Sequence, residues 1–439
     1  MFSKNQIRLL LFTFILFFHI LSFSAGAQEI VPVIGKDPFK PYLTGKAPQI
    51  LIDLGEEVHD SVRIRKLVFC SRIIETSTGK ETSMIFAAIA RPEKPGHYPG
   101  LLVLHGGAGW ADIERAKKWA KQGYIALVLD EPGIANPEKV PLSGGPWKNF
   151  SYGGGRFTVQ PDINNSTIFE GVLASVQALY LLHDQPDVVP DHIGIVGISW
   201  GGYLTTILSG LVNQMIRASF SVYGSGFYDV GSTFLKELNK MPAADRATWL
   251  KYLDAGRRAT AIKTPFFIAA ATNDNWFYPP AVMATLRATK GQVNHLFSPN
   301  SSHKIILPGG TTETKPEQPG WLSMEQVYFE YFLKDKGFPL PVIERMSQVK
   351  LKKASDTGYI QVRFKIKSPL PIMEAQVIYS KPEEEWTKRN WIIIPVESSE
   401  GGWYQAKIPV KDSSRVLNWY ANVSDTRPVS VSSYIVRTK

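Results

Sequence analysis

The sequence predicts an α/β fold, in which helices flank a mostly parallel sheet, followed by a smaller all-β domain. From about Val62 onward, short runs rich in Val, Ile and Leu alternate with longer amphipathic segments, which is typical of strand–helix units on a parallel sheet. After Gly337 the pattern changes to short strands without helices. The chain has 439 residues, of which 44% are hydrophobic, so it is long enough for two or three domains with buried cores.

The predicted sheet has eight strands, each a short apolar run bounded by turn residues. These strands are expected at residues 62–70, 85–91, 101–105, 124–130, 192–199, 218–223, 266–271 and 293–298. The first two have no helix between them and Gly79 in their connection, so we expect an antiparallel hairpin at one edge of the sheet. Amphipathic segments predict helices at residues 112–121, 166–184, 202–212, 280–289 and 324–336.

Residues 345–439 predict a small β-sandwich, which follows a linker containing Gly337, Pro339 and Pro341. Its expected strands are at residues 348–352, 360–366, 374–380, 391–396, 403–409, 416–423 and 429–436. The large rings of this domain could form a sugar-stacking face, but aromatic residues in a small sandwich more often belong to the core, and we favour the core. These rings belong to Trp386, Trp391, Trp403, Tyr404, Trp419 and Tyr420.

The amino terminus has the features of a cleaved secretory signal. Two basic residues precede an apolar run over residues 9–23, and small side chains follow at Ala25 and Ala27. The run of about 15 residues is shorter than the roughly 20 needed to span a bilayer. We therefore expect residues 1–27 to be removed, residues 28–340 to form the first domain, and the mature protein to be exported without stable membrane insertion.

The composition excludes several classes of function. Cys70 is the only cysteine, which rules out an intrachain disulfide and any cysteine-based zinc or iron–sulfur site. The formal net charge is +10, but the positive residues form no block of five or six like charges. We therefore expect no nucleic-acid partner. The sequence does not indicate an oligomeric state.

The strongest chemical signal is a Gly-x-Ser-x-Gly pentapeptide, Gly197 to Gly201, centred on Ser199. The pattern alone is weak evidence, because glycine and serine are both common residues. Its place between an expected strand and an expected helix is more informative, since a nucleophilic serine needs a strained turn whose small neighbours let strand and helix approach closely. We therefore expect Ser199 to be a nucleophile.

A serine hydroxyl needs a base to remove its proton and a carboxylate to orient that base. Asp274 follows the expected strand 266–271, and His303 follows the expected strand 293–298. Because parallel strands end at the same edge of a sheet, both side chains are expected to lie beside Ser199.

Other carboxylates and imidazoles compete for these roles. Asp229 and Asp254 are loop carboxylates that could replace Asp274, and they remain open alternatives. His183, His192 and His295 lie before or at the start of strands, so we expect them at the opposite edge of the sheet from the serine.

A reaction at a carbonyl group also needs N–H donors for the negative oxygen that forms. The backbone N–H of Trp200, directly after the serine, is the first expected donor. The second is expected from the glycine-rich loop after the strand at 101–105, and we assign it to Gly107. His105 precedes this loop, and we expect it to pack beneath the loop rather than to act as the base.

Residues 62–338 resemble the α/β-hydrolases, and more narrowly the branch of dienelactone hydrolases, acetylxylan esterases and prolyl oligopeptidase-like enzymes. The matching stretches are Tyr98-Pro99-Gly100 leading into Leu101 to Gly109, Asp191 to Gly194 leading into the pentapeptide, and Thr272-Asn273-Asp274 followed by Tyr278-Pro279. The resemblance implies Ser199 as nucleophile, His303 as general base and then acid, and Asp274 as the orienting acid, with no metal and no cofactor. The chain differs from acetylxylan esterases in its appended β domain, and from prolyl oligopeptidases in lacking a propeller-sized region before the catalytic domain.

These observations predict an exported serine ester hydrolase that acts through an acyl-enzyme, with a small-molecule or carbohydrate ester as its substrate and partner. A prolyl oligopeptidase-like peptidase is the first alternative, and a non-catalytic glycan-binding protein is the second. The stretch from residue 131 to 160, which contains Trp147, Phe150, Tyr152 and Phe157, is expected either to cover the mouth of the site or to form an ordered surface loop.

Overall fold

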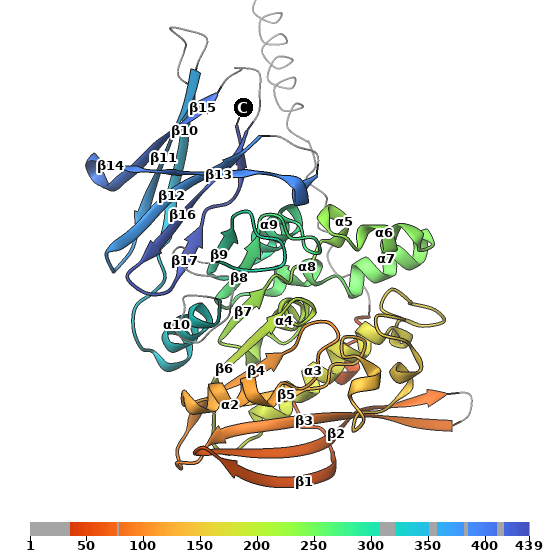
Figure 1. Cartoon of the computed structure of the whole chain (residues 1–439). Helices are drawn as coiled ribbons and strands as arrows, with labels where there is room; N and C mark the ends of the chain where they lie inside the picture. Colours follow the sequence, from red (N-terminus) through yellow and green to blue (C-terminus); the bar gives the residue numbers. More distant parts are fainter. Residues whose placement is uncertain are drawn as a thin grey trace, which may run out of the picture.

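The computed structural model describes residues 36–76, 79–306, 321–350, 358–381, 385–410 and 417–438. The predicted signal segment, residues 1–27, lies outside these ranges. Figure 1 shows an α/β domain built on one large twisted sheet and a β domain beside the end of that sheet. Within the described residues no helix is both long and apolar enough to cross a bilayer.

The described main sheet has nine strands in the order β1-β2-β3-β5-β4-β6-β7-β8-β9. Their bounds are β1 (Ile50–His59), β2 (Val62–Thr76), β3 (Gly79–Pro92), β4 (Tyr98–Leu104), β5 (Ile125–Leu129), β6 (Val188–Ile198), β7 (Ala218–Val222), β8 (Phe266–Ala271) and β9 (Val293–Ser298). From β5 to β9 all neighbours are parallel, whereas β1, β2 and β3 are antiparallel. The predicted fold class and the antiparallel pairing of β2 with β3 are therefore confirmed, although β1 and not this hairpin forms the edge of the sheet.

The prediction of eight strands was wrong by one, because β1 was not expected. This strand pairs only with β2, and nearly all of its residues are exposed. Its sequence, ILIDLGEEVH, mixes apolar and acidic residues and has a register shift after Asp53. An edge strand of this kind buries neither face, so it leaves no continuous apolar run for sequence analysis to detect.

Helices cover both faces of the sheet. Two glycines of β6, Gly194 and Gly197, show which helix lies on each face. A Cβ added at Gly197 would come closer than 3.0 Å to the backbone of Gly201 in α4 (Trp200–Leu211). A Cβ added at Gly194 would meet Leu333 and Phe329 of α10 (Trp321–Lys334) at 2.8 Å. Residues three apart on a strand face opposite sides, so α4 and α10 lie on opposite faces.

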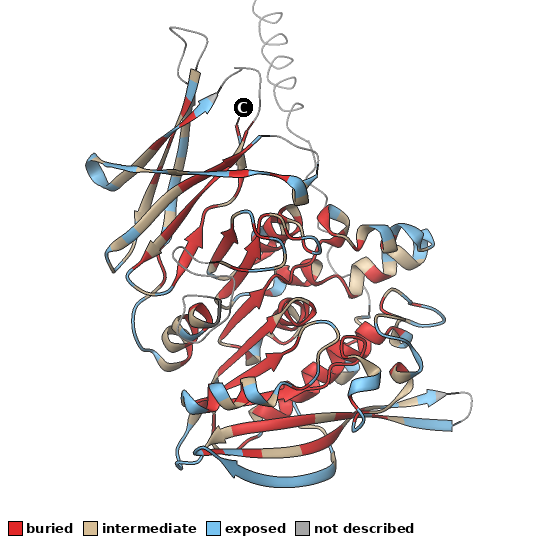
Figure 2. Cartoon of the chain, in the orientation of Figure 1, coloured by how far each residue is buried: buried red, intermediate tan, exposed pale blue. Residues whose placement is uncertain are grey.

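The other expected helices are also present. They are α2 (Ile113–Lys121), α3 (Thr167–His183) and α9 (Pro279–Ala288). Figure 2 shows α3 as almost wholly buried, and its residues Thr167 to Leu182 are all buried. The short helices between β7 and β8 were not expected, because most span too few turns to show a helical period. They are α5 (Tyr228–Gly231), α6 (Leu235–Lys240), α7 (Ala243–Tyr252) and α8 (Ala255–Arg258).

The β domain contains two antiparallel sheets. The first has the order β10-β11-β15-β14, with bounds β10 (Val342–Lys350), β11 (Gly358–Lys367), β15 (Trp403–Val410) and β14 (Glu397–Ser399). The second has the order β13-β12-β16-β17, with β18 also paired to β16, and its bounds are β13 (Trp391–Pro395), β12 (Ile372–Ser380), β16 (Asn418–Asp425), β17 (Ser430–Ser432) and β18 (Val436–Arg437).

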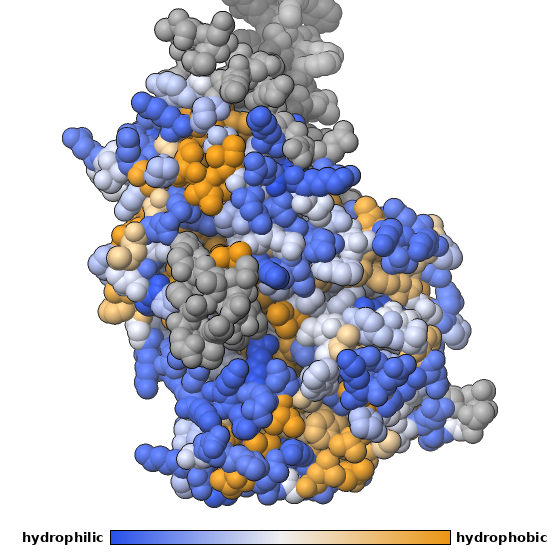
Figure 3. Space-filling model, in the orientation of Figure 1, coloured by the Kyte–Doolittle hydropathy of each residue, from blue (hydrophilic) through white to orange (hydrophobic). Residues whose placement is uncertain are grey.

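Only half of the aromatic residues singled out in this domain are buried. Trp391, Trp419 and Tyr420 are at most 2% exposed, whereas the other three are half-buried. Figure 3 shows apolar groups gathered over the region of β13, where Ile392 and Ile393 are exposed. The domain therefore has a core of large rings and an apolar outer strand.

The β domain shares a hydrophobic core with the α/β domain. One cluster joins Phe266 and Phe297 of the main sheet to Trp391 and Tyr420 of the β domain. The backbone of Phe297 also makes polar contacts, because its N–H donates to the Ser432 hydroxyl at 2.7 Å and its carbonyl accepts from the Tyr420 hydroxyl at 3.2 Å. The β domain therefore packs against the β9 edge of the main sheet.

The close approach of α4 to the sheet gives a test of this packing. A Cβ at Gly202 would lie 2.7 Å from both the Val222 carbonyl oxygen and the Gly224 nitrogen, which are backbone atoms that cannot rotate away. We expect Gly202→Ala to lower the free energy of unfolding by about 1–3 kcal/mol, the usual cost of overpacking. Urea unfolding measures this change.

Gly144→Ala is the matched control, because its Cβ would meet only the end of the flexible Met84 side chain. Equal losses of stability for the two variants would show that the backbone contact of Gly202 is unimportant.

Candidate active site

Ser199 lies in the turn between β6 and α4. Its backbone has φ 58° and ψ −116°, a conformation that residues other than glycine rarely adopt. The Ser199 N–H donates to the Val222 carbonyl of β7 at 2.8 Å, and the residue is half-buried. Gly197 and Gly201 leave the space for this turn. A serine held in a strained strand–turn–helix junction has the geometry of a nucleophile elbow.

Asp274 and His303 meet at the ends of neighbouring strands. Asp274 follows β8 and is fully buried, and its Oδ1 accepts hydrogen bonds from the backbone N–H groups of Trp276 at 2.7 Å and Phe277 at 3.1 Å. His303 follows β9, and its Nδ1 donates to Asp274 Oδ2 at 2.9 Å. This hydrogen bond holds the ring and leaves Nε2 available for proton transfer.

Tyr223 connects this pair to the serine turn. Its ring packs on the His303 ring, with centroids 4.1 Å apart, and it directly follows Val222, whose carbonyl accepts from Ser199. Burial, and secondarily the Asp274 carboxylate, raises the pKa of the Tyr223 hydroxyl, which therefore stays protonated. Among the hydrogen bonds of the described residues none joins Ser199 to His303, so this contact stays a prediction.

The glycine loop that contains Gly107 lies beside Ser199 and Trp200. A Cβ added at Gly106 would be 3.6 Å from Ser199 Cβ, and one added at Gly107 would be 3.1 Å from Cδ1 of Trp200. The glycine loop therefore passes next to the serine, and Gly107 lies against the side chain of Trp200. It stays a prediction that the backbone N–H groups of Gly107 and Trp200 donate to the same substrate oxygen.

His105 lies beneath this loop. Its Nδ1 donates to the Gly106 carbonyl at 2.7 Å, and its Nε2 accepts from the Glu131 N–H at 3.2 Å. The His105 N–H in turn donates to the Glu131 carboxyl at 2.8 Å. Burial lowers the pKa of His105 to about 4, so the ring is neutral at pH 7. With both ring nitrogens occupied, His105 supports the loop and is not placed to act as a base.

A stack of Tyr152, Arg156 and Trp200, which the sequence did not indicate, lies against the glycine loop. The Arg156 guanidinium lies 4.7 Å from the centroid of the Tyr152 ring and 4.5 Å from that of Trp200. Arg156 is buried, whereas Tyr152 is 43% exposed, and its hydroxyl occupies the space that a Cβ on Gly107 would need. Tyr152 was noted in the expected covering loop, but no local pattern could indicate that Arg156 lies between two rings.

A row of packed aromatic rings runs from Trp200 through Phe234 to Trp276. The Phe234 ring lies 4.9 Å from the Trp200 ring and 6.0 Å from the Trp276 ring, measured between centroids. Phe234 is buried, and Trp276 is 45% exposed. The Trp276 N–H donates to Asp274, so the half-exposed Trp276 ring lies in the same loop as that carboxylate. This ring is available to pack against a bound molecule.

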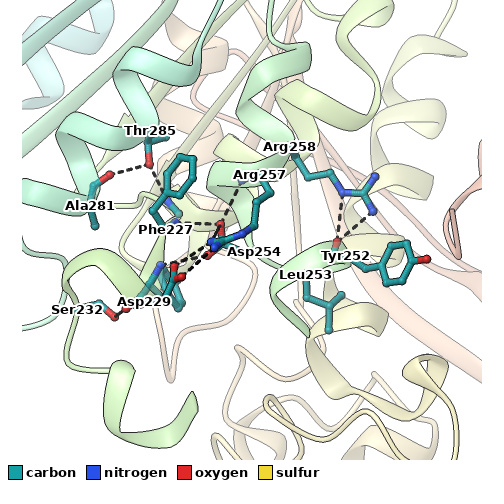
Figure 4. Close-up of polar contacts among 12 residues, drawn as sticks. Phe227, Asp229, Ser232, Tyr252, Leu253, Asp254, Arg257, Arg258, Ala281 and Thr285 are labelled. Carbon is teal, nitrogen blue, oxygen red and sulfur yellow. Dashed lines mark hydrogen bonds and ion pairs between the residues drawn. The ribbon is translucent and has the colours of Figure 1, made fainter. Parts of the chain in front are cut away.

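The two alternative carboxylates, Asp229 and Asp254, form hydrogen bonds with residues other than His303, as Figure 4 shows. Asp254 is fully buried and accepts from the backbone N–H groups of Phe227, Tyr228 and Arg257. Asp229 binds the Arg257 guanidinium through both oxygens, at 2.9 and 2.8 Å. Both acids therefore stabilise the loops around α5 and α8.

The rival imidazoles also have other surroundings. His295 is buried in β9 with its ring 4.8 Å from the Tyr434 ring, and burial lowers its pKa to about 4. His192 Nδ1 is 2.8 Å from the Leu333 carbonyl, and His183 ends α3. In the part of the chain that the structure describes, no group of three His, Cys, Asp or Glu residues is arranged to hold a metal ion.

Comparison with known proteins agrees with this architecture. Residues 85–299 match the model of the Dienelactone hydrolase family, a range that includes Ser199 and Asp274 and ends before His303. Acetyl xylan esterase 1 from Thermoanaerobacterium sp. JW/SL YS485 has a similar structure, with 17% sequence identity and a TM-score of 0.52, covering 67% of this chain and 92% of that chain. The acetyl xylan esterase from Paenibacillus sp. R4 has 18% identity and a TM-score of 0.49 over the same shares. At such identities the likeness shows the fold alone, and no curated protein matches the sequence.

The contact between Gly107 and Tyr152 gives a test of the glycine loop. In Gly107→Ala the new Cβ would come closer than 3.0 Å to the Tyr152 hydroxyl, so either the Tyr152 ring or the glycine loop must shift, and we expect the loop to shift. We expect the rate at which a fluorophosphonate labels Ser199 to fall about 10- to 100-fold, because donors displaced by about 1 Å stabilise the developing charge poorly.

Adding Tyr152→Phe removes the clashing oxygen and leaves the ring carbon Cζ at an ordinary distance of 3.5 Å. We expect this second change to restore part of the labelling rate, relative to Tyr152→Phe alone. A double variant as slow as Gly107→Ala would contradict the clash as the cause.

The two buried carboxylates, Asp274 and Asp254, are distinguished by a pair of substitutions. Asp274→Asn keeps an oxygen for Trp276 and Phe277 but no longer fixes the ring of His303, so labelling of Ser199 is expected to slow by up to about 10⁴-fold with little loss of stability. Asp254→Asn weakens buried backbone hydrogen bonds, so it is expected to cost about 1–3 kcal/mol of unfolding free energy with near-normal labelling. The labelling rate and the thermal unfolding of each variant are measured. Slow labelling in Asp254→Asn with normal labelling in Asp274→Asn would make Asp254 the functional acid.

Proposed function

We propose that this chain, an α/β-hydrolase whose residues 85–299 match the Dienelactone hydrolase family, is a serine ester hydrolase. We further propose that it is exported and that it removes small acyl groups from carbohydrates. The strongest support is the 2.9 Å hydrogen bond between His303 and Asp274, at the same sheet edge as a serine with a strained backbone. The basic and apolar character of residues 1–27 supports export.

In the first half of the proposed reaction, His303 Nε2 accepts the proton of the Ser199 hydroxyl as its oxygen attacks the carbonyl carbon of the ester. The carbonyl oxygen becomes negative and accepts hydrogen bonds from the backbone N–H groups of Trp200 and Gly107. Asp274 stabilises the protonated ring of His303 through its Nδ1–H. The bond to the alcohol then breaks, and His303 returns the proton to the departing alcohol oxygen.

The second half releases the acyl group. A water molecule enters where the alcohol left, and His303 accepts one of its protons while its oxygen attacks the acyl carbon. The same N–H groups hold the second oxyanion. The bond to Ser199 breaks, the serine oxygen recovers a proton from His303, and the carboxylic acid leaves. Serine, imidazole and carboxylate complete this reaction without any other reacting group.

The choice of substrate has two further supports. The structural relative with the TM-score of 0.52 is named an acetyl xylan esterase. The half-exposed ring of Trp276, beside the orienting acid, offers an apolar surface of the kind on which sugar rings stack.

The nucleophile is tested by Ser199→Ala with p-nitrophenyl acetate as substrate. We expect turnover to fall to the rate of the uncatalysed background, because the proposed reaction has no nucleophile for the ester other than the Ser199 hydroxyl. Ser347→Ala, at an exposed position of the β domain, is the control and should keep full activity. Unchanged turnover by folded Ser199→Ala would reject the mechanism.

The same preparation tests the substrate class with acetylated xylo-oligosaccharides, feruloyl esters and dipeptide anilides. We expect acetate release from the acetylated sugars to be the fastest reaction. Preferred cleavage of the anilides would instead indicate a peptidase, and binding to a polysaccharide column without labelling of Ser199 by a fluorophosphonate would indicate a glycan-binding protein.

A further inference from the structure

The loops that contain Asp274 and His303 are bonded directly to the β domain. Asn273, which precedes the acid, donates from its side-chain amide to the carbonyls of Thr387 at 3.2 Å and Arg389 at 2.6 Å. Asn300, in the loop of His303, donates to the Trp391 carbonyl at 2.7 Å and accepts from the Trp391 N–H at 2.8 Å. The side chain of Asn300 thus pairs with Trp391 as a neighbouring strand would.

The two loops are also bonded to each other. The Asn273 N–H donates to the Ser301 carbonyl at 3.0 Å, and the Asn300 N–H donates to the Thr272 hydroxyl at 2.9 Å. The Thr272 hydroxyl in turn donates to Asn273 Oδ1 at 2.7 Å. Because these bonds link the two loops just before Asp274 and just before His303, we expect a displacement of either loop to change the geometry of that pair.

The segment of the β domain that receives these bonds is itself well anchored. Trp391 is 2% exposed, and its ring packs on Tyr420 at 5.4 Å and on Trp386 at 6.3 Å between centroids. The Arg389 guanidinium lies 3.5 Å from the centroid of the Trp386 ring. Since Trp391 and Tyr420 belong to the core shared with the main sheet, the segment 386–391 is a fixed support for both loops.

From this arrangement we infer that the β domain is a positioning element of the active site, which sets the relative placement of His303 and Asp274 through Asn300 and Asn273. The inference rests on the proposed triad. A catalytic group displaced by about 1 Å can lower a rate by about 10²-fold. A single partly solvated hydrogen bond contributes only about 0.5–1.5 kcal/mol to stability, so removing these bonds should disturb the geometry of the site more than the stability of the fold.

The test compares Asn273→Ala, Asn300→Ala and the double variant in the full chain, with p-nitrophenyl acetate. Each single variant is expected to lower kcat about tenfold, and the double variant about a hundredfold, with KM within twofold. The acidic limb of the kcat/KM profile is expected to move to lower pH, because a loosened Asp274 contact stabilises the protonated imidazole less. A purely structural role would not move this limb.

Ser432→Ala is the matched control. It removes a hydrogen bond of the same domain interface, to the Phe297 N–H, that touches neither loop. We expect it to lower the melting temperature while kcat and the pH profile stay unchanged. If the asparagine variants keep wild-type kcat and pH profile while Ser199→Ala is inactive, the inference fails and the proposed function stands. If Ser199→Ala retains activity, the triad itself fails.

Discussion

The site depends first on one close backbone approach, that of α4 to the ends of β4, β6 and β7. Gly197, Gly201 and Gly202 have no side chains at the points where a Cβ would meet backbone atoms at less than 3.0 Å. This approach forces Ser199 into its left-handed conformation with its N–H bonded to Val222. The strain is local, and the parallel sheet stabilises it because β6 is buried between helices on both faces.

The same sheet edge brings the other groups together. Strands β6 to β9 are parallel neighbours, so the loops after them open on one side. Tyr223 follows β7, Asp274 follows β8 and His303 follows β9, and ring packing and a hydrogen bond join them in that order. The carboxyl ends of parallel strands at such an edge are the usual place for ligand sites in α/β proteins.

The β domain adds to this arrangement where it covers β9. Its contacts with Phe297 bury the last strand of the main sheet, and its contacts with Asn273 and Asn300 reach the two loops that follow β8 and β9. An exposed edge strand would otherwise leave unpaired backbone groups and mobile loops. The β domain therefore both extends the hydrophobic core over β9 and contacts the loops that contain Asp274 and His303.

The order of the eight expected strands and five expected helices, the turn at Ser199, and the positions of Asp274 and His303 after strands could be predicted from the sequence, because they depend on local hydropathy patterns and on the common direction of parallel strands. The sequence did not indicate β1, whose exposed mixture of Ile50, Asp53 and Glu57 shows no apolar period, or the short helices α5 to α8. Only the tertiary structure decided that Arg156 lies between Tyr152 and Trp200, that Asp254 is committed to backbone N–H groups, and that Asn273 and Asn300 bind the β domain. These contacts join residues far apart in the chain, and they depend on how packed surfaces fit together, which no local pattern records.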